Sequence, residues 1–268
     1  MGTFQRSVMK ENKEDYKVVY TVSDVGDLIP CVLRSIESLE KFVSKKNIIV
    51  FYTPPRSREN YLKLSNVAVV KEVDNITKPF DVLAAQKKAK GLPLSPRHYG
   101  EKVHLCEVEC ENVLFLDADT VVRKDITELL AGNYDFSALP PAYEMDEALV
   151  AKAFASIGKD PLPQFNCGFL IFKNSLHVRI KDLWLKYIND ETLADDQFHT
   201  KEQWALSLAL ANVNPRIRYM TFIHNARIWA GKAHVDAYVL HGVTLPSNKR
   251  LRAWFGRERK RVLRKIGL

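Results

Sequence analysis

The chain has 268 residues, of which 46% are hydrophobic and 27% charged. This composition is typical of a globular protein and excludes disordered and collagen-like classes, while the length allows one α/β domain or two small ones. No apolar run approaches the roughly 20 residues that cross a bilayer, and the N-terminus is polar. We therefore expect a cytoplasmic protein.

The formal net charge of +8 is confined to the end of the chain. Residues 249–268 hold nine Lys/Arg and one Glu, whereas the remainder holds 31 basic and 31 acidic residues. The pI of about 9.2 therefore describes a basic tail and does not predict a nucleic-acid partner. We divide the chain into a domain, residues 1–248, and a tail, residues 249–268.

Hydrophobic periodicity predicts strands that alternate with helices along the domain. The predicted strands are 16–22, 47–52, 67–73, 113–116, 134–139, 165–172, 216–223 and 237–240. The predicted helices are 28–43, 57–64, 80–90, 99–110, 125–130, 144–157, 178–190 and 201–211. This alternation favours an α/β fold with a Rossmann-like, mostly parallel sheet. Because there is no Gly-rich phosphate loop, any bound phosphate must be held mainly by a metal ion and side chains.

Two carboxylates, Asp117 and Asp119, directly follow the apolar strand Val113 to Leu116. The carboxyl end of a strand is where open α/β sheets bind ligands, and residues two apart point to the same side. Both carboxylates can therefore bind one Mg²⁺ or Mn²⁺ ion, and Ala118 between them is small enough to admit a diphosphate. The alternative is a capped turn, since Asp-x-Asp-Thr also begins helices well.

Further short motifs accompany this pair. They are Lys102-Val103-His104-Leu105, Phe165-Asn166-Cys167-Gly168-Phe169, Glu202-Gln203 before an apolar helix, and Tyr238-Val239-Leu240-His241-Gly242. In this order the motifs resemble GT-A glycosyltransferases, especially the retaining family 8 enzymes that include glycogenin and galactinol synthase. The resemblance runs from Tyr16 to Gly242 and is sharpest between Tyr99 and Lys173. It implies a single mixed sheet flanked by helices, to which the composition of the tail adds a basic C-terminal helix.

The resemblance also implies an activity and a site. A sugar would be transferred from a nucleotide-diphosphate sugar to a saccharide, glycolipid or protein acceptor, with retention of configuration. The expected donor is a UDP-sugar. Mn²⁺ or Mg²⁺ would be held by Asp117, Asp119 and His241. The residues expected to contact the nucleotide-sugar are Thr21, Val22, Ser23, Lys102, Asp117, Ala118, Gly168 and Lys249, and those expected to position the anomeric carbon are Asn166, Glu202 and Gln203.

Two departures from the family pattern leave choices open. The family's Lys-Pro-Trp after the metal-binding His is missing, and Lys249 is the candidate replacement for its lysine. Asp196-Gln197 competes with Glu202-Gln203 for the acidic pair. We prefer the latter because an apolar helix follows it directly.

Functions of other classes also fit parts of the sequence. A haloacid dehalogenase-type phosphohydrolase would use Asp117 as its nucleophile, because that motif also places Asp-x-Asp after a strand. Three predicted strands precede Asp117, however, whereas that motif normally opens its domain. A non-catalytic nucleotide-sugar-binding module would leave several of the motifs unexplained.

The tail has apolar residues at helical spacing, including Trp254 and Phe255, among its basic residues. Such a helix can lie in an anionic membrane interface, which would place the protein on the cytoplasmic face of a membrane and favour a membrane-borne acceptor. The alternative is a helix packed on the domain with its charges in water.

Overall fold

The structure, a computed structural model, describes residues 15–77, 97–140, 147–190, 201–227 and 236–243. Among these residues a seven-stranded sheet has the order β3-β2-β1-β4-β7-β6-β8. Its strands are β1 (Tyr16–Val22), β2 (Ile48–Tyr52), β3 (Val69–Glu72), β4 (Asn112–Leu116), β6 (Phe136–Leu139), β7 (Asn166–Phe172) and β8 (Ile217–Tyr219). A smaller sheet of three strands has the order β5-β10-β9, with β5 (Thr120–Val122), β9 (Asn225–Arg227) and β10 (Val239–His241).

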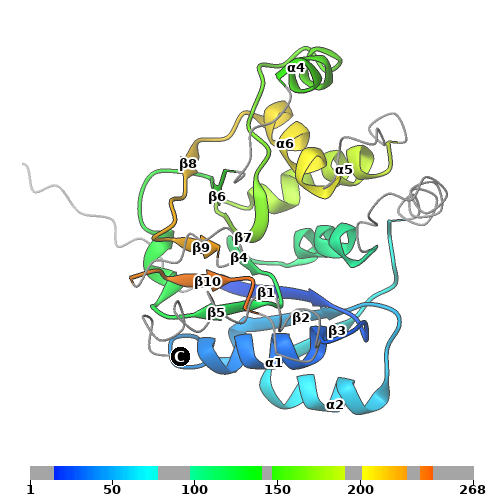
Figure 1. The fold of residues 1–268 in the computed structure, drawn as a ribbon, viewed down its shortest axis with the longest axis vertical. Helices are drawn as coiled ribbons and strands as arrows, with labels where there is room; N and C mark the ends of the chain where they lie inside the picture. The colour runs from blue at the N-terminus through cyan, green and yellow to red at the C-terminus, as the bar shows by residue number, and fades with distance from the viewer. Residues whose placement is uncertain (1–14, 78–96, 141–146, 191–200, 228–235, 244–268) are drawn as a thin grey trace, which may run out of the picture.

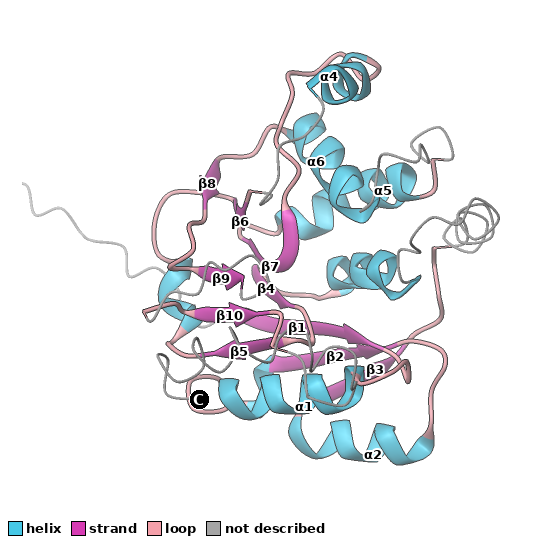
Figure 2. Ribbon diagram, viewed as in Figure 1, coloured by secondary structure: helices cyan, strands magenta, loops and turns pink. Residues whose placement is uncertain are grey.

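Helices cover both faces of the large sheet, as Figures 1 and 2 show. Helices α1 (Leu28–Leu39) and α2 (Arg58–Val67) lie on one side, and α5 (Leu176–Ile188) and α6 (Lys201–Val213) on the other. The remaining described helices are α4 (Glu147–Ala155) and the 3₁₀ helices η1 (Lys45–Asn47), η2 (Arg97–Glu107) and η3 (Ile126–Leu130). Within the described residues, no helix combines the length and apolar character that crossing a membrane requires.

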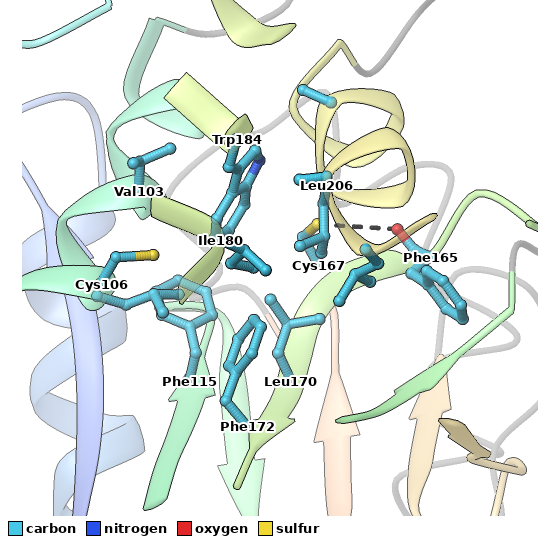
Figure 3. Packing of buried hydrophobic residues seen from close by; sticks show 14 of the residues in the cluster. Val103, Cys106, Phe115, Phe165, Cys167, Leu170, Phe172, Ile180, Trp184 and Leu206 are labelled. Atoms are coloured by element: carbon cyan, nitrogen blue, oxygen red, sulfur yellow. Dashed lines mark hydrogen bonds between the residues drawn. The ribbon is translucent and has the colours of Figure 1, made fainter. Parts of the chain in front are cut away.

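Strand β4 is buried on both faces, as its continuous apolar sequence predicts. Phe115 packs in the cluster beneath α5 and α6, whereas Leu114 and Leu116 pack in the cluster beneath α1. Figure 3 shows Phe115 and Phe172 of neighbouring strands below Trp184 of α5. Packing on both sides holds the end of β4, and hence Asp117, in a fixed position.

The large sheet is mixed, and its antiparallel part has a direct bearing on the site. Strands β3, β2, β1 and β4 are parallel, whereas β7 runs antiparallel to both β4 and β6. The start of β7 therefore lies beside the carboxyl end of β4, and Leu116 pairs with Phe169. This direction brings Asn166 and Gly168 to the edge of the sheet where Asp117 lies.

The small sheet contains two strands that the sequence pattern did not predict. Strand β5 follows Asp119 at once and pairs antiparallel with β10, so that Thr120 lies opposite His241. The predicted strand 216–223 is shorter in the structure, because Thr221 and His224 form a turn in which His224 Nδ1 accepts from Thr221 N at 3.1 Å. Strand β9 begins directly after this turn and runs parallel to β10.

The predicted helix 99–110 is a 3₁₀ helix, η2, rather than an α-helix. A three-residue repeat aligns the side chains of Glu101, His104 and Glu107 on one face. His104 lies 3.3 Å from a carboxylate oxygen of each glutamate, and its Nε2 lies 3.0 Å from the carbonyl oxygen of Asp74. Buried Glu101 also accepts from the backbone N–H groups of residues 76 and 77. These contacts tie η2 to the segment after β3.

Some predictions fall outside the described residues. They are the helix 80–90, the competing pair Asp196-Gln197, Lys249 and the tail 249–268.

Protonation of His104 should stabilise the fold. Burial disfavours the charged ring, but Glu101 and Glu107 raise the pKa of His104 above its usual value. The stabilisation is therefore complete below the unfolded-state pKa of about 6.5 and is lost as pH rises through the folded-state pKa. We expect His104→Gln to lower the melting temperature more at pH 6 than at pH 9.

His177 provides a matched control of opposite sign. Its Nε2 lies 2.9 Å from the carbonyl oxygen of Val108, and burial lowers the pKa of His177. Folding therefore favours the neutral form of His177, and the contribution of that form to the stability of the fold is lost as pH falls. A His104→Gln effect that is equal at both pH values would contradict the assignment.

Candidate active site

Three potential metal ligands meet where the two sheets join. Asp117 follows β4, Asp119 precedes β5, and His241 ends β10. One ligand atom from each lies within 4.8 Å of the others, and His241 Nε2 is 3.4 Å from Asp117 Oδ2 and 3.4 Å from Asp119 Oδ1. Two carboxylate oxygens and one imidazole nitrogen are a donor set that Mn²⁺ accepts readily and Mg²⁺ accepts in part. The residues present therefore fit a divalent cation, and this is the only such group found among the described residues.

The electrostatics of the group follow from its burial and its charges. Burial opposes protonation of His241, but Asp119 and Asp117 outweigh it and raise its pKa to about 9. Burial also opposes the ionised form of Asp117, yet Lys102 and His241 hold the pKa of Asp117 at about 2. Asp117 thus remains negatively charged at neutral pH and attracts a cation.

Gly168 is required by the close approach of β7 to His241. A Cβ atom at Gly168 would overlap the imidazole ring of His241. In addition, Asp117 N donates to the Gly168 carbonyl at 2.9 Å, while Gly242 N and Val243 N donate to the Asp119 carbonyl at 3.0 and 2.9 Å. These backbone bonds hold the three segments of the site together.

Lys102 is a buried cation beside the carboxylates. Its Nζ is 2.7 Å from Asp117 Oδ1 and donates to the Cys167 carbonyl at 3.3 Å. Although burial by itself lowers the pKa of Lys102, the charge of Asp117 raises it above the ordinary value. The ammonium group therefore stays charged and adds positive potential next to the predicted metal position.

A chain of buried hydroxyl groups supports the turn that carries Asp117. Thr120 Oγ1 donates to the Asp117 carbonyl at 2.8 Å and lies 2.8 Å from Ser35 Oγ, which is 2.9 Å from the Tyr20 hydroxyl. Ser38 Oγ, from the same helix as Ser35, accepts from Val122 N at 2.8 Å. Helix α1 thereby holds the beginning and the end of β5.

Glu202 lies in the first turn of α6 with 1% of its surface exposed. Neither carboxylate oxygen has a hydrogen-bond partner among the described residues, and burial raises the pKa of Glu202 against the opposing charge of Lys102. The backbone of Glu202 is fixed by Trp184, whose Nε1 donates to its carbonyl at 3.0 Å. Gln203, next in the chain, is partly exposed.

Thr21 and Val22 end β1, one strand away from Asp117, and Ser23 follows them directly. Val22 and Ser23 are buried, and the buried Oγ1 of Thr21 has no partner in the described part of the chain. Ala118, between the two aspartates, is 7% exposed, and its side chain is a single methyl group.

Two residues of β9 lie beside the site and were not predicted from the sequence. Arg227 pairs in register with His241, and buried Asn225 donates from Nδ2 to Asn166 Oδ1 at 3.4 Å. The short sequence Asn225 to Arg227 carries no period-two apolar pattern, and its pairing with β10 arises only on folding. A buried Asn two residues before an Arg has no distinctive sequence signal.

Solved glycosyltransferases have a similar fold. The galactosyltransferase LgtC, solved with donor and acceptor sugar analogues, gives a TM-score of 0.60 at 17% identity and covers 94% of this chain and 96% of its own. The glycosyltransferase GlyE of Streptococcus pneumoniae gives 0.57 at 15% identity, with 90% of this chain and 60% of its own covered. No curated protein sequence matches the chain. At these identities the likeness defines the fold, which is that of the GT-A glycosyltransferases.

The family follows from the sequence itself. The model of glycosyl transferase family 8 matches residues 7–219, which is most of the chain. The chain therefore belongs to glycosyl transferase family 8, as its motif order predicts, and is a glycosyltransferase. This membership decides against the phosphohydrolase alternative with Asp117 as nucleophile.

Substitution of Gly168 by Ala should disrupt the site through one contact. The added methyl group overlaps the His241 ring, so Gly168→Ala should cost about 1–3 kcal/mol of stability and abolish Mn²⁺ binding measured by calorimetry. In a His241→Ala background the same substitution should cost less than about 1 kcal/mol, because the overlapping ring is gone. An equal cost in both backgrounds would place the steric conflict elsewhere.

Proposed function

We propose that the protein is a divalent-metal-dependent glycosyltransferase that uses a nucleotide-diphosphate sugar, with UDP as the nucleotide and Mn²⁺ or Mg²⁺ as the ion. The observation that carries the proposal is the meeting of Asp117, Asp119 and His241 beside the buried ammonium of Lys102. Departure of a nucleoside diphosphate leaves negative charge on its phosphates, and fixed positive charge is what stabilises that transition state. A bound metal ion would supply Lewis acidity toward the diphosphate oxygens.

The chain's own residues would bind and orient the donor around that ion. Thr21, Val22 and Ser23 would line the base and ribose, and small Ala118 and Gly168 would leave room for the diphosphate. Lys102 would keep Asp117 ionised and contribute its own positive charge. In the family pattern Lys249 would add a contact to the diphosphate.

Asn166, Glu202 and Gln203 would hold the donor sugar. Glu202 is a buried carboxyl group without hydrogen-bond partners in the described part of the chain, at the start of a helix. Such a group favours positive charge nearby, so it would stabilise charge that develops at the anomeric carbon. We propose transfer with retention of configuration, as the family resemblance implies.

We further propose that residues 1–248 form the transferase domain and that the basic tail, residues 249–268, binds anionic membrane. The acceptor would then be a saccharide on a lipid, and the protein would act on the cytoplasmic face of a membrane. Nine basic residues and the aromatic pair Trp254 and Phe255 support this proposal.

Asp119→Ala should abolish transfer while leaving the fold intact, because it removes a ligand from a surface turn. We expect nucleotide release from UDP-sugars to fall at least about 100-fold, and EDTA to have the same effect on the unsubstituted protein. Asp160→Ala, at an exposed aspartate, is the control and should change nothing. Full activity in EDTA would refute metal dependence, and donor binding without transfer to any acceptor would indicate a binding module.

Glu202→Gln should lower kcat about 100-fold and change the donor KM less than about threefold, because the lost charge matters most in the transition state. Glu59, an exposed glutamate in the first turn of α2, provides a matched control, since Glu59→Gln makes the same change far from the site. Unchanged turnover in Glu202→Gln would either assign the role to Asp196 or remove it.

Removal of residues 249–268 should abolish salt-sensitive binding to membranes. Each basic residue near an anionic surface contributes on the order of 1 kcal/mol, so the full chain should sediment with anionic liposomes at low salt and less at high salt. If both forms sediment equally, or neither does, the tail has another role.

A further inference from the structure

The amide side chains of Asn166 and Asn225 meet at the junction of the two sheets. Asn166 is the first residue of β7, and Asn225 is the first residue of β9. Asn225 is completely buried, and its Nδ2 donates to Asn166 Oδ1 at 3.4 Å. Two residues further along each strand are Gly168, packed against the His241 ring, and Arg227, which pairs in register with His241. The two amides therefore lie at the edge of the predicted metal site.

The backbone of Gly168 determines which way these amides point. Gly168 N donates to Asn166 Oδ1 at 3.3 Å, and a backbone N–H has no capacity to accept. The oxygen of Asn166 must therefore face Gly168, because the opposite flip would bring two N–H donors together. Asn225 then has to offer Nδ2 to that same oxygen, which leaves its own Oδ1 buried without a partner in the described part of the chain.

With its oxygen engaged twice, Asn166 has only its NH₂ group to offer to a ligand. That group makes no hydrogen bond with other described residues, and the side chain is partly exposed, whereas Asn225 is not. We propose that Asn225 is a positioning residue that fixes the carboxamide of Asn166, so that Asn166 donates a hydrogen bond to a hydroxyl oxygen of the donor sugar. This inference rests on the proposed function and assigns both a new residue and a direction to the sugar contact.

The experiment separates the sugar contact from the binding of the nucleotide. The donor is first chosen as the UDP-sugar from which the protein releases nucleotide. Affinity for UDP with Mn²⁺ then reports the metal and diphosphate contacts, whereas kcat/KM for the chosen UDP-sugar also reports the sugar contact. Asn225→Ala removes the donor to Asn166, and the isosteric Asn225→Asp replaces that donor with an acceptor. We expect kcat/KM to fall about tenfold in Asn225→Ala and further in Asn225→Asp, with UDP affinity within about twofold of the starting value.

Asn212 provides a control of the same chemistry away from the site. Its Nδ2 donates to the Tyr187 hydroxyl at 2.9 Å and to the Leu208 carbonyl at 2.8 Å. Asn212→Ala should lower the melting temperature without changing kcat/KM relative to UDP affinity. The same behaviour in both Asn225 variants would show a merely structural role and would overturn the inference.

Asn166→Ala separates a failure of the positioning role from a failure of the proposed function. If Asn166→Ala lowers kcat/KM and both Asn225 variants do not, the positioning role is wrong and the proposed function stands. If Asn166→Ala has no effect either, Asn166 does not contact the sugar and the inference falls with it. A chain that binds UDP with Mn²⁺ but accepts no UDP-sugar would overturn both.

Discussion

The chain changes sheets within three residues, and the site depends on that change. Asp117 directly follows β4 of the large sheet, and Asp119 directly precedes β5 of the small sheet. The two carboxylates are thus held by the hydrogen bonds of different sheets, and His241 lies beside them on a third strand, β10. Convergence of ligands from separate rigid elements gives a site its precise geometry, because each ligand is held by its own packing.

Burial of charge at this junction is balanced locally. Lys102 and Asp117 form an ion pair whose side chains are only 6% and 20% exposed, and His241 Nε2 lies 3.4 Å from a carboxylate oxygen of both Asp117 and Asp119. An isolated buried charge would be costly, so each member of this group depends on the others. The same arrangement offers a nucleoside diphosphate both positive charge and a place for a divalent ion, which links the electrostatics of the fold to the proposed transfer reaction.

The antiparallel strand β7 contributes to structure and function at once. Its central residues fill the core beneath α5, while its first residues reach the carboxyl edge of β4. Gly168 permits contact with His241, and Asn166 receives hydrogen bonds from Gly168 and from Asn225. A parallel strand in this position would begin at the opposite edge and would carry none of these residues to the site.

The sequence by itself determined the elements with strong local patterns and predicted the residue types of the candidate site. The strand before Asp117 was recognisable because it is continuously apolar, and the ligand types of Asp117, Asp119 and His241 indicated a hard cation in the context of the family motifs. The family was likewise readable from motif order, since residues of fixed chemistry recur at the ends of strands.

Only the tertiary structure decided features that depend on contacts between distant segments. The strands β5 and β9 are three residues each and exist because β10 pairs with both of them. The helix η2 is 3₁₀, a form that places Glu101 and His104 on one face, where both contact the segment after β3; local propensity does not contain these contacts. Asn225 likewise lies beside Asn166 only because β9 pairs with β10 in the folded chain. Periodicity reports which face of an element is buried, whereas the identity of the partner depends on how the whole chain packs.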